Sequence, residues 1–269
     1  MSPAITFDGE EGSVAQKSRP TVAVLSLFVP AACGHVGDPA FAQEVSIVRC
    51  NHANYCAHHG YTYVNPTIGS AAYSQLNRQH GTHAKVDLIL QTLQAGEFDW
   101  LLWLDIDAVF YRRGLSIEYW IEIAARRAAH IVAAADIRGF PFNGGAMLIK
   151  SSSWSQHFFT RANHTLRWMP HDSLLQDQPG YYYMLNSDLF NESRRIYIVS
   201  PRARFQAFTK LNETKSAEWI VHSSRLCEAH LYGAHQCSIR TYVERECLPP
   251  HASGSVHTTY HAQNGDTAV

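Results

Sequence analysis

The chain has 269 residues, of which 46% are hydrophobic and 17% charged, so it is long enough to bury a sizeable core in one or two domains. Its 22 Lys and Arg balance 23 Asp and Glu, and this near-neutral charge argues against nucleic acid as the main partner. The longest apolar run, 22–32, is interrupted by Ser26 and Pro30 and is too short to span a bilayer. The composition predicts an ordinary globular protein whose 16 histidines could include metal ligands.

The two ends of the chain differ in composition from its body. Residues 1–20 and 249–269 are rich in Gly, Ser, Pro, His and Thr and show no apolar periodicity. Such segments cannot bury enough apolar surface to fold. We therefore expect two disordered tails around a single domain over 21–248.

In chain order, the body begins with a predicted buried strand over 22–29, followed by a helix over 41–59 that Gly60 ends. A second helix is predicted over 82–94, with Thr82 as its cap, and a third over 153–167. Short apolar runs predict five more buried strands, at 100–104, 131–135, 146–149, 196–199 and 219–221. This alternation is typical of an α/β domain with a mostly parallel sheet.

Two carboxylates, Asp105 and Asp107, directly follow the most apolar of these strands. Ligands of open α/β sheets bind beyond the carboxyl ends of strands. The period of two along a strand would turn both side chains to one side, where they could hold one divalent cation. A D-x-D triplet alone is more often a solvated turn, but its place after a buried strand favours a site for Mn²⁺ or Mg²⁺.

The D-x-D context resembles glycosyltransferases of the GT-A type, specifically the retaining α-galactosyl-, α-xylosyl- and α-mannosyltransferases of fungi and plants. Further blocks resemble this family in its own order: 51–61, His83-Ala84-Lys85, 142–150 with Ser153-Trp154, Gln176-Asp177-Gln178, and 219–222. The resemblance covers about 21–228 and is more specific than any single block. It implies a Rossmann-like GT-A domain with a mostly parallel mixed sheet flanked by helices.

The resemblance also implies the chemistry of the site. Asp105, Asp107 and His222 would hold Mn²⁺ or Mg²⁺ against the diphosphate of a UDP- or GDP-linked sugar, and a glycan or glycoconjugate hydroxyl would accept that sugar with retention of configuration. Asp177 would stabilise positive charge at the anomeric carbon, with Gln178 hydrogen-bonding beside it. The donor-binding residues would be Lys85, Asp105, Asn143, Gly144, Gly145 and Arg225. Arg225 would replace a basic residue that the family carries near a Gly-Cys pair.

Several of these residues have simpler interpretations that the sequence leaves open. Lys85 could pair with a phosphate or with a D-x-D carboxylate, or merely face water on a helix. Asp177 could be a helix cap, and 143–145 could be a simple turn before a strand. Four soft ligands between Cys227 and Cys237 match no common zinc spacing, so a disulfide or ordinary loop residues explain them better. Two alternative functions remain: a nucleotide-sugar transferase of the glycogenin-like or plant cell-wall type, and an inactive sugar-binding module.

The compartment is indicated only weakly. Six cysteines suggest buried thiols with one or two disulfides, and N-glycosylation sequons begin at Asn163, Asn191 and Asn212. These sequons and the family resemblance favour the Golgi or ER lumen. Residues 1–20, however, contain no visible signal peptide or membrane anchor.

Overall fold

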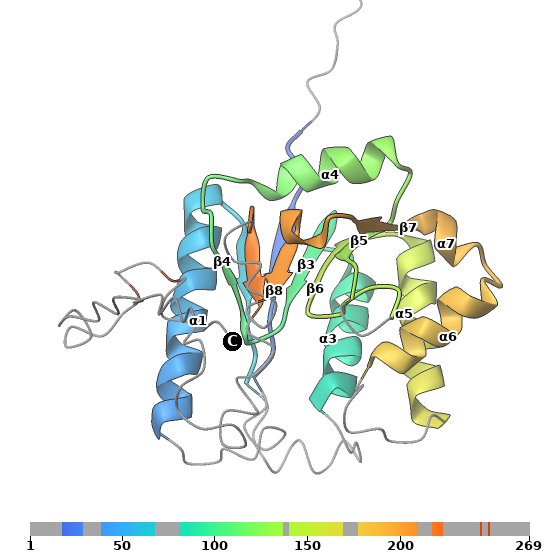
Figure 1. The fold of residues 1–269 in the computed structure, drawn as a ribbon, viewed down its shortest axis with the longest axis horizontal. Helices are drawn as coiled ribbons and strands as arrows, with labels where there is room; N and C mark the ends of the chain where they lie inside the picture. The colour runs from blue at the N-terminus through green and yellow to red at the C-terminus, as the bar shows by residue number, and fades with distance from the viewer. Residues whose placement is uncertain are drawn as a thin grey trace, which may run out of the picture.

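The computed structural model describes residues 18–28, 39–67, 81–136, 140–168, 177–208 and 217–222, with Val243 and Cys247. Its main sheet has the strand order β2-β1-β3-β6-β5-β7 (Figure 1). The strands are β1 Val22–Leu25, β2 Thr62–Val64, β3 Trp100–Leu104, β5 Ile131–Ala134, β6 Ala146–Lys150 and β7 Ile196–Val199. Only β6 runs antiparallel to its neighbours in this sheet. The predicted mostly parallel α/β architecture is confirmed.

A second, smaller sheet lies beside the first, in the order β4-β9-β8. Its strands are β4 Ala108–Phe110, β8 Gln206–Phe208 and β9 Ile220–His222. The strand predicted at 219–221 is β9, whereas the other three-residue strands, β2, β4 and β8, were not predicted. The antiparallel register of β4 and β9 sets Ala108 opposite His222. His222, more than 100 positions later in the chain, is thereby brought next to the two aspartates.

The helices are α1 Pro39–His59, α3 Gly81–Ala95, α4 Ile117–Arg126, α5 Ser153–Trp168, α6 Gln178–Ser187 and α7 Glu192–Arg195, and Arg202–Arg204 form the short 3₁₀ helix η2. The three predicted helices are confirmed to within two residues at each end. Gly60 ends α1 as predicted, with φ of 72° and the Tyr61 N–H donating to the Cys56 carbonyl. The predicted cap was wrong, because α3 begins at Gly81 and Thr82 lies inside it.

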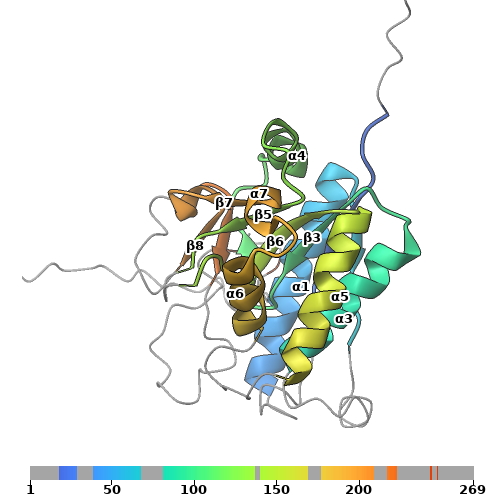
Figure 2. The same ribbon diagram turned by 90° about the vertical axis from the view of Figure 1, so that its right-hand side faces the viewer.

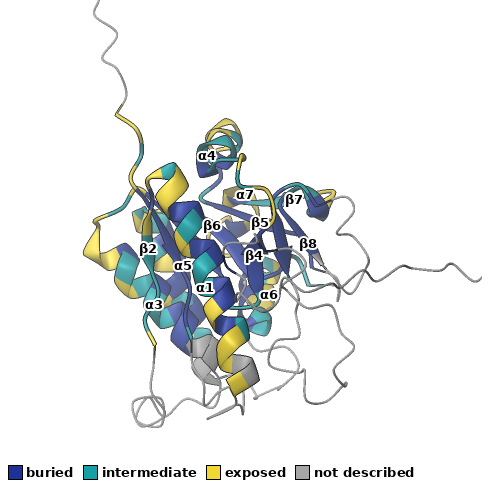
Figure 3. Ribbon diagram, turned by 90° about the vertical axis from the view of Figure 1, so that its left-hand side faces the viewer, coloured by how far each residue is buried: buried dark blue, intermediate teal, exposed yellow. Residues whose placement is uncertain are grey.

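Helices cover both faces of the main sheet (Figures 1 and 2). The alternation along β1 sends Val22 and Val24 to the cluster that α1 and α4 cover. It sends Ala23 and Leu25 to the opposite cluster, which α3, α5 and α6 cover. The central strands are consequently buried along their length (Figure 3).

The cysteines and the described helices bear on the cellular compartment of the protein. Cys50 and Cys247 form a disulfide, and Cys56 is a buried free thiol. Cys227 and Cys237 lie outside the described residues, as do the predicted tails apart from residues 18–20. Among the helices that the structure describes, none is long and apolar enough to cross a membrane.

Candidate metal and donor site

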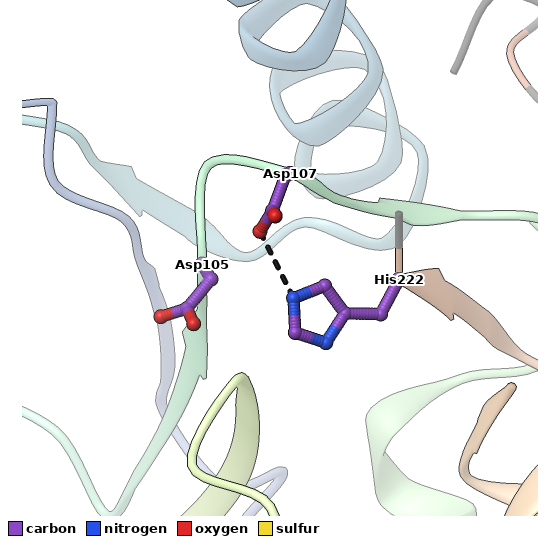
Figure 4. Close-up of side chains that lie close together, drawn as sticks. All are labelled: Asp105, Asp107 and His222. Carbon is purple, nitrogen blue, oxygen red and sulfur yellow. Dashed lines mark hydrogen bonds and ion pairs between the residues drawn. The ribbon is translucent and has the colours of Figure 1, made fainter. Parts of the chain in front are cut away.

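The two aspartates follow β3 in a turn, which the Ala108 N–H closes by donating to the Asp105 carbonyl at 3.0 Å. Their side chains converge with that of His222, and one ligand atom from each residue lies within 4.8 Å of the others (Figure 4). The two carboxylates do not converge for the reason that the sequence predicted, which was the period of two along a strand. Asp107 belongs to the turn and not to an extended strand, so the period of two does not apply to it. The turn brings the carboxylates together instead.

His222 reaches the aspartates from the end of β9. Its Nε2 lies 3.0 Å from Asp107 Oδ1, and its side chain is 7% exposed. Burial alone would lower the pKa of His222, but the neighbouring carboxylates of Asp107 and Asp105 outweigh burial and raise this pKa. The imidazole is therefore held in a field of negative charge.

The three side chains suit a divalent cation. Two carboxylates and one imidazole form a donor set that Mn²⁺ accepts and that Mg²⁺ can use in part. Burial raises the pKa of Asp105, and the carboxylates of Asp107 and Asp177 raise it further while Lys85 opposes them. The side chains of Asp105 and Asp107 remain 29% and 17% exposed, so a diphosphate could approach from solvent. A cation would relieve this concentration of negative charge.

Lys85 is buried beneath the aspartates, at 2% exposure. Its Nζ lies 2.8 Å from Asp177 Oδ2 and 3.3 Å from Asp105 Oδ1, and it donates to the Gly144 carbonyl at 3.1 Å. Burial would lower the pKa of Lys85, but the two carboxylates raise it. The interpretation of Lys85 as a lysine facing water is wrong. Lys85 joins the D-x-D turn to Asp177.

Trp103 also holds Asp105, and sequence reasoning missed it. The indole Nε1 donates to Asp105 Oδ1 at 2.7 Å. Trp103 stands two positions before Asp105 in the buried strand β3, and this spacing places both on one face. That spacing was the signal that could have identified it.

Asp177 immediately precedes α6 but makes no side-chain capping bond. It is 3% exposed and paired with Lys85, so the interpretation as a simple helix cap is wrong. In the orientation that satisfies both its polar atoms, the Gln178 amide nitrogen donates to Asp136 Oδ2 at 3.0 Å and to the Phe142 carbonyl at 3.2 Å. Asp177 and Gln178 therefore have different partners, although they are neighbours in the chain.

The two glycines fit tightly between the site's side chains. A Cβ on Gly144 would lie 2.8 Å from Asp177 Oδ2, and one on Gly145 would lie 2.7 Å from His222 Nδ1. Neither has a positive φ; in the described part of the chain the glycines that do are Gly60 and Gly96. Close approach by protein side chains requires glycine at both positions.

Asn143 lies at the centre of a buried hydrogen-bond network. Its Oδ1 accepts the Gly145 N–H at 2.8 Å and the Gln206 Nε2–H at 3.0 Å, and its Nδ2 donates to Asp136 Oδ2 at 2.8 Å. Gln206 Nε2 also lies within hydrogen-bond distance of His222 Nδ1. No local pattern marks Gln206 or Asp136 as site residues, since both enter the site through tertiary contacts.

Arg225, the remaining predicted donor-binding residue, lies outside the described residues. The structure thus brings Asp105, Asp107 and His222 into one group, with Lys85, Asp177, Gly144 and Gly145 packed against it.

Comparison with known proteins bears on both sequence and fold. Residues 19–126 match the model of the galactosyl transferase GMA12/MNN10 family. A glycosyltransferase involved in the glycosylation of the major capsid of PBCV-1 is similar in structure, with a TM-score of 0.58 and 15% identity over 77% of this chain and 95% of that one. GlyE, a glycosyltransferase of Streptococcus pneumoniae TIGR4, gives a TM-score of 0.44 and 14% identity over 76% of this chain and 54% of that one. No curated protein sequence matches the chain.

Proposed function

We propose that this chain, a glycosyltransferase by its family match and its fold, transfers a sugar from a nucleotide-sugar donor to a glycan hydroxyl with a divalent cation held by Asp105, Asp107 and His222. The observation that carries the proposal is the convergence of these three side chains within 4.8 Å. From the resemblance in sequence we further propose a galactosyl, xylosyl or mannosyl donor linked to UDP or GDP, Mn²⁺ or Mg²⁺ as the cation, and retention of configuration.

When the bond between the sugar and the nucleotide breaks, negative charge develops on the departing nucleoside diphosphate. The reaction therefore requires positive charge at this position in the site. A divalent cation bound at the site would supply positive charge there. Lys85 lies behind the aspartates, and its ammonium pairs with the buried carboxylate of Asp177 and with that of Asp105. In this proposal Lys85 acts on the donor through these carboxylates.

Asp177 is our candidate for the carboxylate that stabilises positive charge on the sugar. It is held by Lys85 and lies directly behind the Gly144 backbone. Because Gly144 and Gly145 carry no side chains, their backbone can lie directly against Asp177 and His222. Gln178 would orient the sugar or acceptor by hydrogen bonding, with its amide fixed by Asp136 and the Phe142 carbonyl. We also assign Asn143 and Arg225 to donor binding, Asn143 through the position that it gives Gly145.

For localisation we propose the Golgi or ER lumen. The Cys50–Cys247 disulfide supports an oxidising compartment. Asn191 of the second sequon is exposed and accessible to glycosylation. Asn163, in helix α5, is less suitable, because its side-chain amide donates to Asp87 Oδ1 of helix α3 at 2.6 Å. Asn212 lies outside the described residues.

The deciding experiment incubates the protein with a panel of UDP- and GDP-sugars, with and without Mn²⁺, and measures release of the nucleoside diphosphate. We expect cation-dependent release from one donor, and its loss in Asp107→Ala. Glu122→Ala serves as the matched control, since the Glu122 carboxylate is 70% exposed on α4 and pairs with Arg126 of the same helix. Activity of Asp107→Ala at the wild-type level would refute the metal assignment. Donor binding without any turnover would favour an inactive sugar-binding module.

A further inference from the structure

Gln206 is a polar residue whose side chain is buried inside the protein, although it belongs to a strand of only three residues. It is fully buried on β8, and its side-chain nitrogen lies between Asn143 Oδ1 and His222 Nδ1. The orientation of this amide is determined by its neighbours. Asn143 turns its oxygen to the Gly145 N–H and its nitrogen to the Asp136 carboxylate, so Gln206 must present its nitrogen to Asn143.

The orientation of the Gln206 amide in turn determines the state of the His222 ring. The amide nitrogen has two hydrogens and no acceptor lone pair, and one hydrogen points to Asn143. The other points to His222 Nδ1, which must then accept it. The ring proton of neutral His222 consequently lies on Nε2, where it is donated to Asp107 Oδ1 at 3.0 Å.

This arrangement conflicts with metal binding through Nε2. A nitrogen that carries a proton has no lone pair for a cation, and a ligating histidine almost always donates its other N–H to an acceptor. His222 must therefore lose the proton at Nε2 and carry one at Nδ1 when a cation binds. The acceptor for that new N–H is already present: Gln206 Oε1 is buried and has no hydrogen-bond partner among the described residues.

We propose that Gln206 is a positioning residue that sets the protonated nitrogen of His222, and that its amide turns when the site binds a cation. In the metal-free protein the amide nitrogen faces His222 and keeps the Nε2–H bond to Asp107. In the metal-bound protein Oε1 faces Nδ1–H, and the bond to Asn143 opens because two acceptors would otherwise meet. This inference rests on the proposed metal site at Asp105, Asp107 and His222.

The first test needs no variant of Gln206 and no metal. Long-range ¹H–¹⁵N spectra of histidine-labelled, metal-free protein identify the protonated nitrogen of each neutral ring, and His222→Gln assigns the relevant signal. The spectra are recorded at a pH where the His222 ring carries one proton. A proton on Nε2 is expected, and a proton on Nδ1 would overturn the inference whether or not the protein binds metal.

The second test titrates Mn²⁺ into wild type, Gln206→Leu and Gln206→Glu and follows binding by electron paramagnetic resonance. Leucine offers no acceptor to Nδ1–H, so we expect affinity to fall about 10- to 100-fold. Glutamate offers one, and its affinity should stay within a few-fold of wild type. If Gln206 merely filled buried space, leucine, which has a similar volume, would bind Mn²⁺ as tightly as wild type, and this result would overturn the inference. Absence of Mn²⁺ binding by wild type would instead refute the proposed metal site, and the spectra would still decide the tautomer.

Discussion

Replacement of Gly145 by alanine should remove metal binding while leaving the fold in place. The added Cβ would lie 2.7 Å from His222 Nδ1, closer still to Cε1, and 2.8 Å from Asn143 Oδ1. Ordinary van der Waals contact begins at about 3.4 Å, so the ring must move by about 1 Å. Overpacking of this kind typically costs about 1–3 kcal/mol of stability. A domain of this size can bear such a loss and remain folded.

The consequence for the metal site is more severe than that for the fold. Ligand distances in metal sites are defined to about 0.2 Å, so a ring displaced by about 1 Å no longer completes the group with Asp105 and Asp107. We expect Mn²⁺ affinity in Gly145→Ala to fall at least about 10- to 100-fold. Isothermal titration measures this affinity, and circular dichroism reports the melting temperature of the same sample.

Two further glycine variants serve as controls for this prediction. A Cβ on Gly144 meets Asp177 Oδ2 at 2.8 Å and Lys85 Nζ at 3.4 Å, so Gly144→Ala should impair turnover more than Mn²⁺ affinity. A Cβ on Gly114 meets nothing within 4 Å, and Gly114→Ala should change neither property. Wild-type Mn²⁺ affinity in Gly145→Ala would show that His222 is not a ligand or that its ring can move without consequence.

Two other predictions concern buried charge. Burial lowers the pKa of His52 to about 4 from 6.5, so the folded state resists a proton that the unfolded state accepts. Stability is therefore complete above pH 6.5 and falls by about 3 kcal/mol between pH 6.5 and 4. Urea unfolding across this range should show a shallower loss in His52→Gln, and an equal loss would contradict the prediction. Lys85→Met leaves Asp105 and Asp177 without their cation and should cost about 3–5 kcal/mol, which adding Asp177→Asn should partly restore. No recovery in the urea midpoint of this double variant would argue against the ion pair.

Elements with a long apolar pattern could be predicted from the sequence, whereas three of the four three-residue strands, β2, β4 and β8, could not. Strand β3 and helix α5 repeat their apolar positions often enough to reveal their period. Helix α4 had the same signal, with buried Ile117, Trp120 and Ala124 at helical spacing, and should have been found. Strands β4 and β8 take their conformation from the pairing with β9, which no local pattern reveals.

The candidate site likewise contains residues that could be predicted from the sequence and contacts that could not. Asp105, Asp107 and His222 were proposed from the motif and the family resemblance, and the structure places them together. Contacts between distant segments were beyond prediction. Gln206 reaches Asn143 across 63 positions of sequence, and the Lys85 ammonium pairs with Asp177, so neither bond has a local signature.

Asn51 and His52, in the first block that resembles the family, act through β4. The Asn51 side chain donates to the Phe110 carbonyl at 3.0 Å and accepts the Phe110 N–H at 2.8 Å, as a neighbouring strand would. His52 Nε2 bonds the Ala108 carbonyl at 2.7 Å. Both ends of β4 are thus fixed by α1, on the edge opposite its pairing with β9. Because Asp107 precedes β4 and His222 lies opposite Ala108, these two buried residues of α1 hold the strand that lies between the candidate metal ligands.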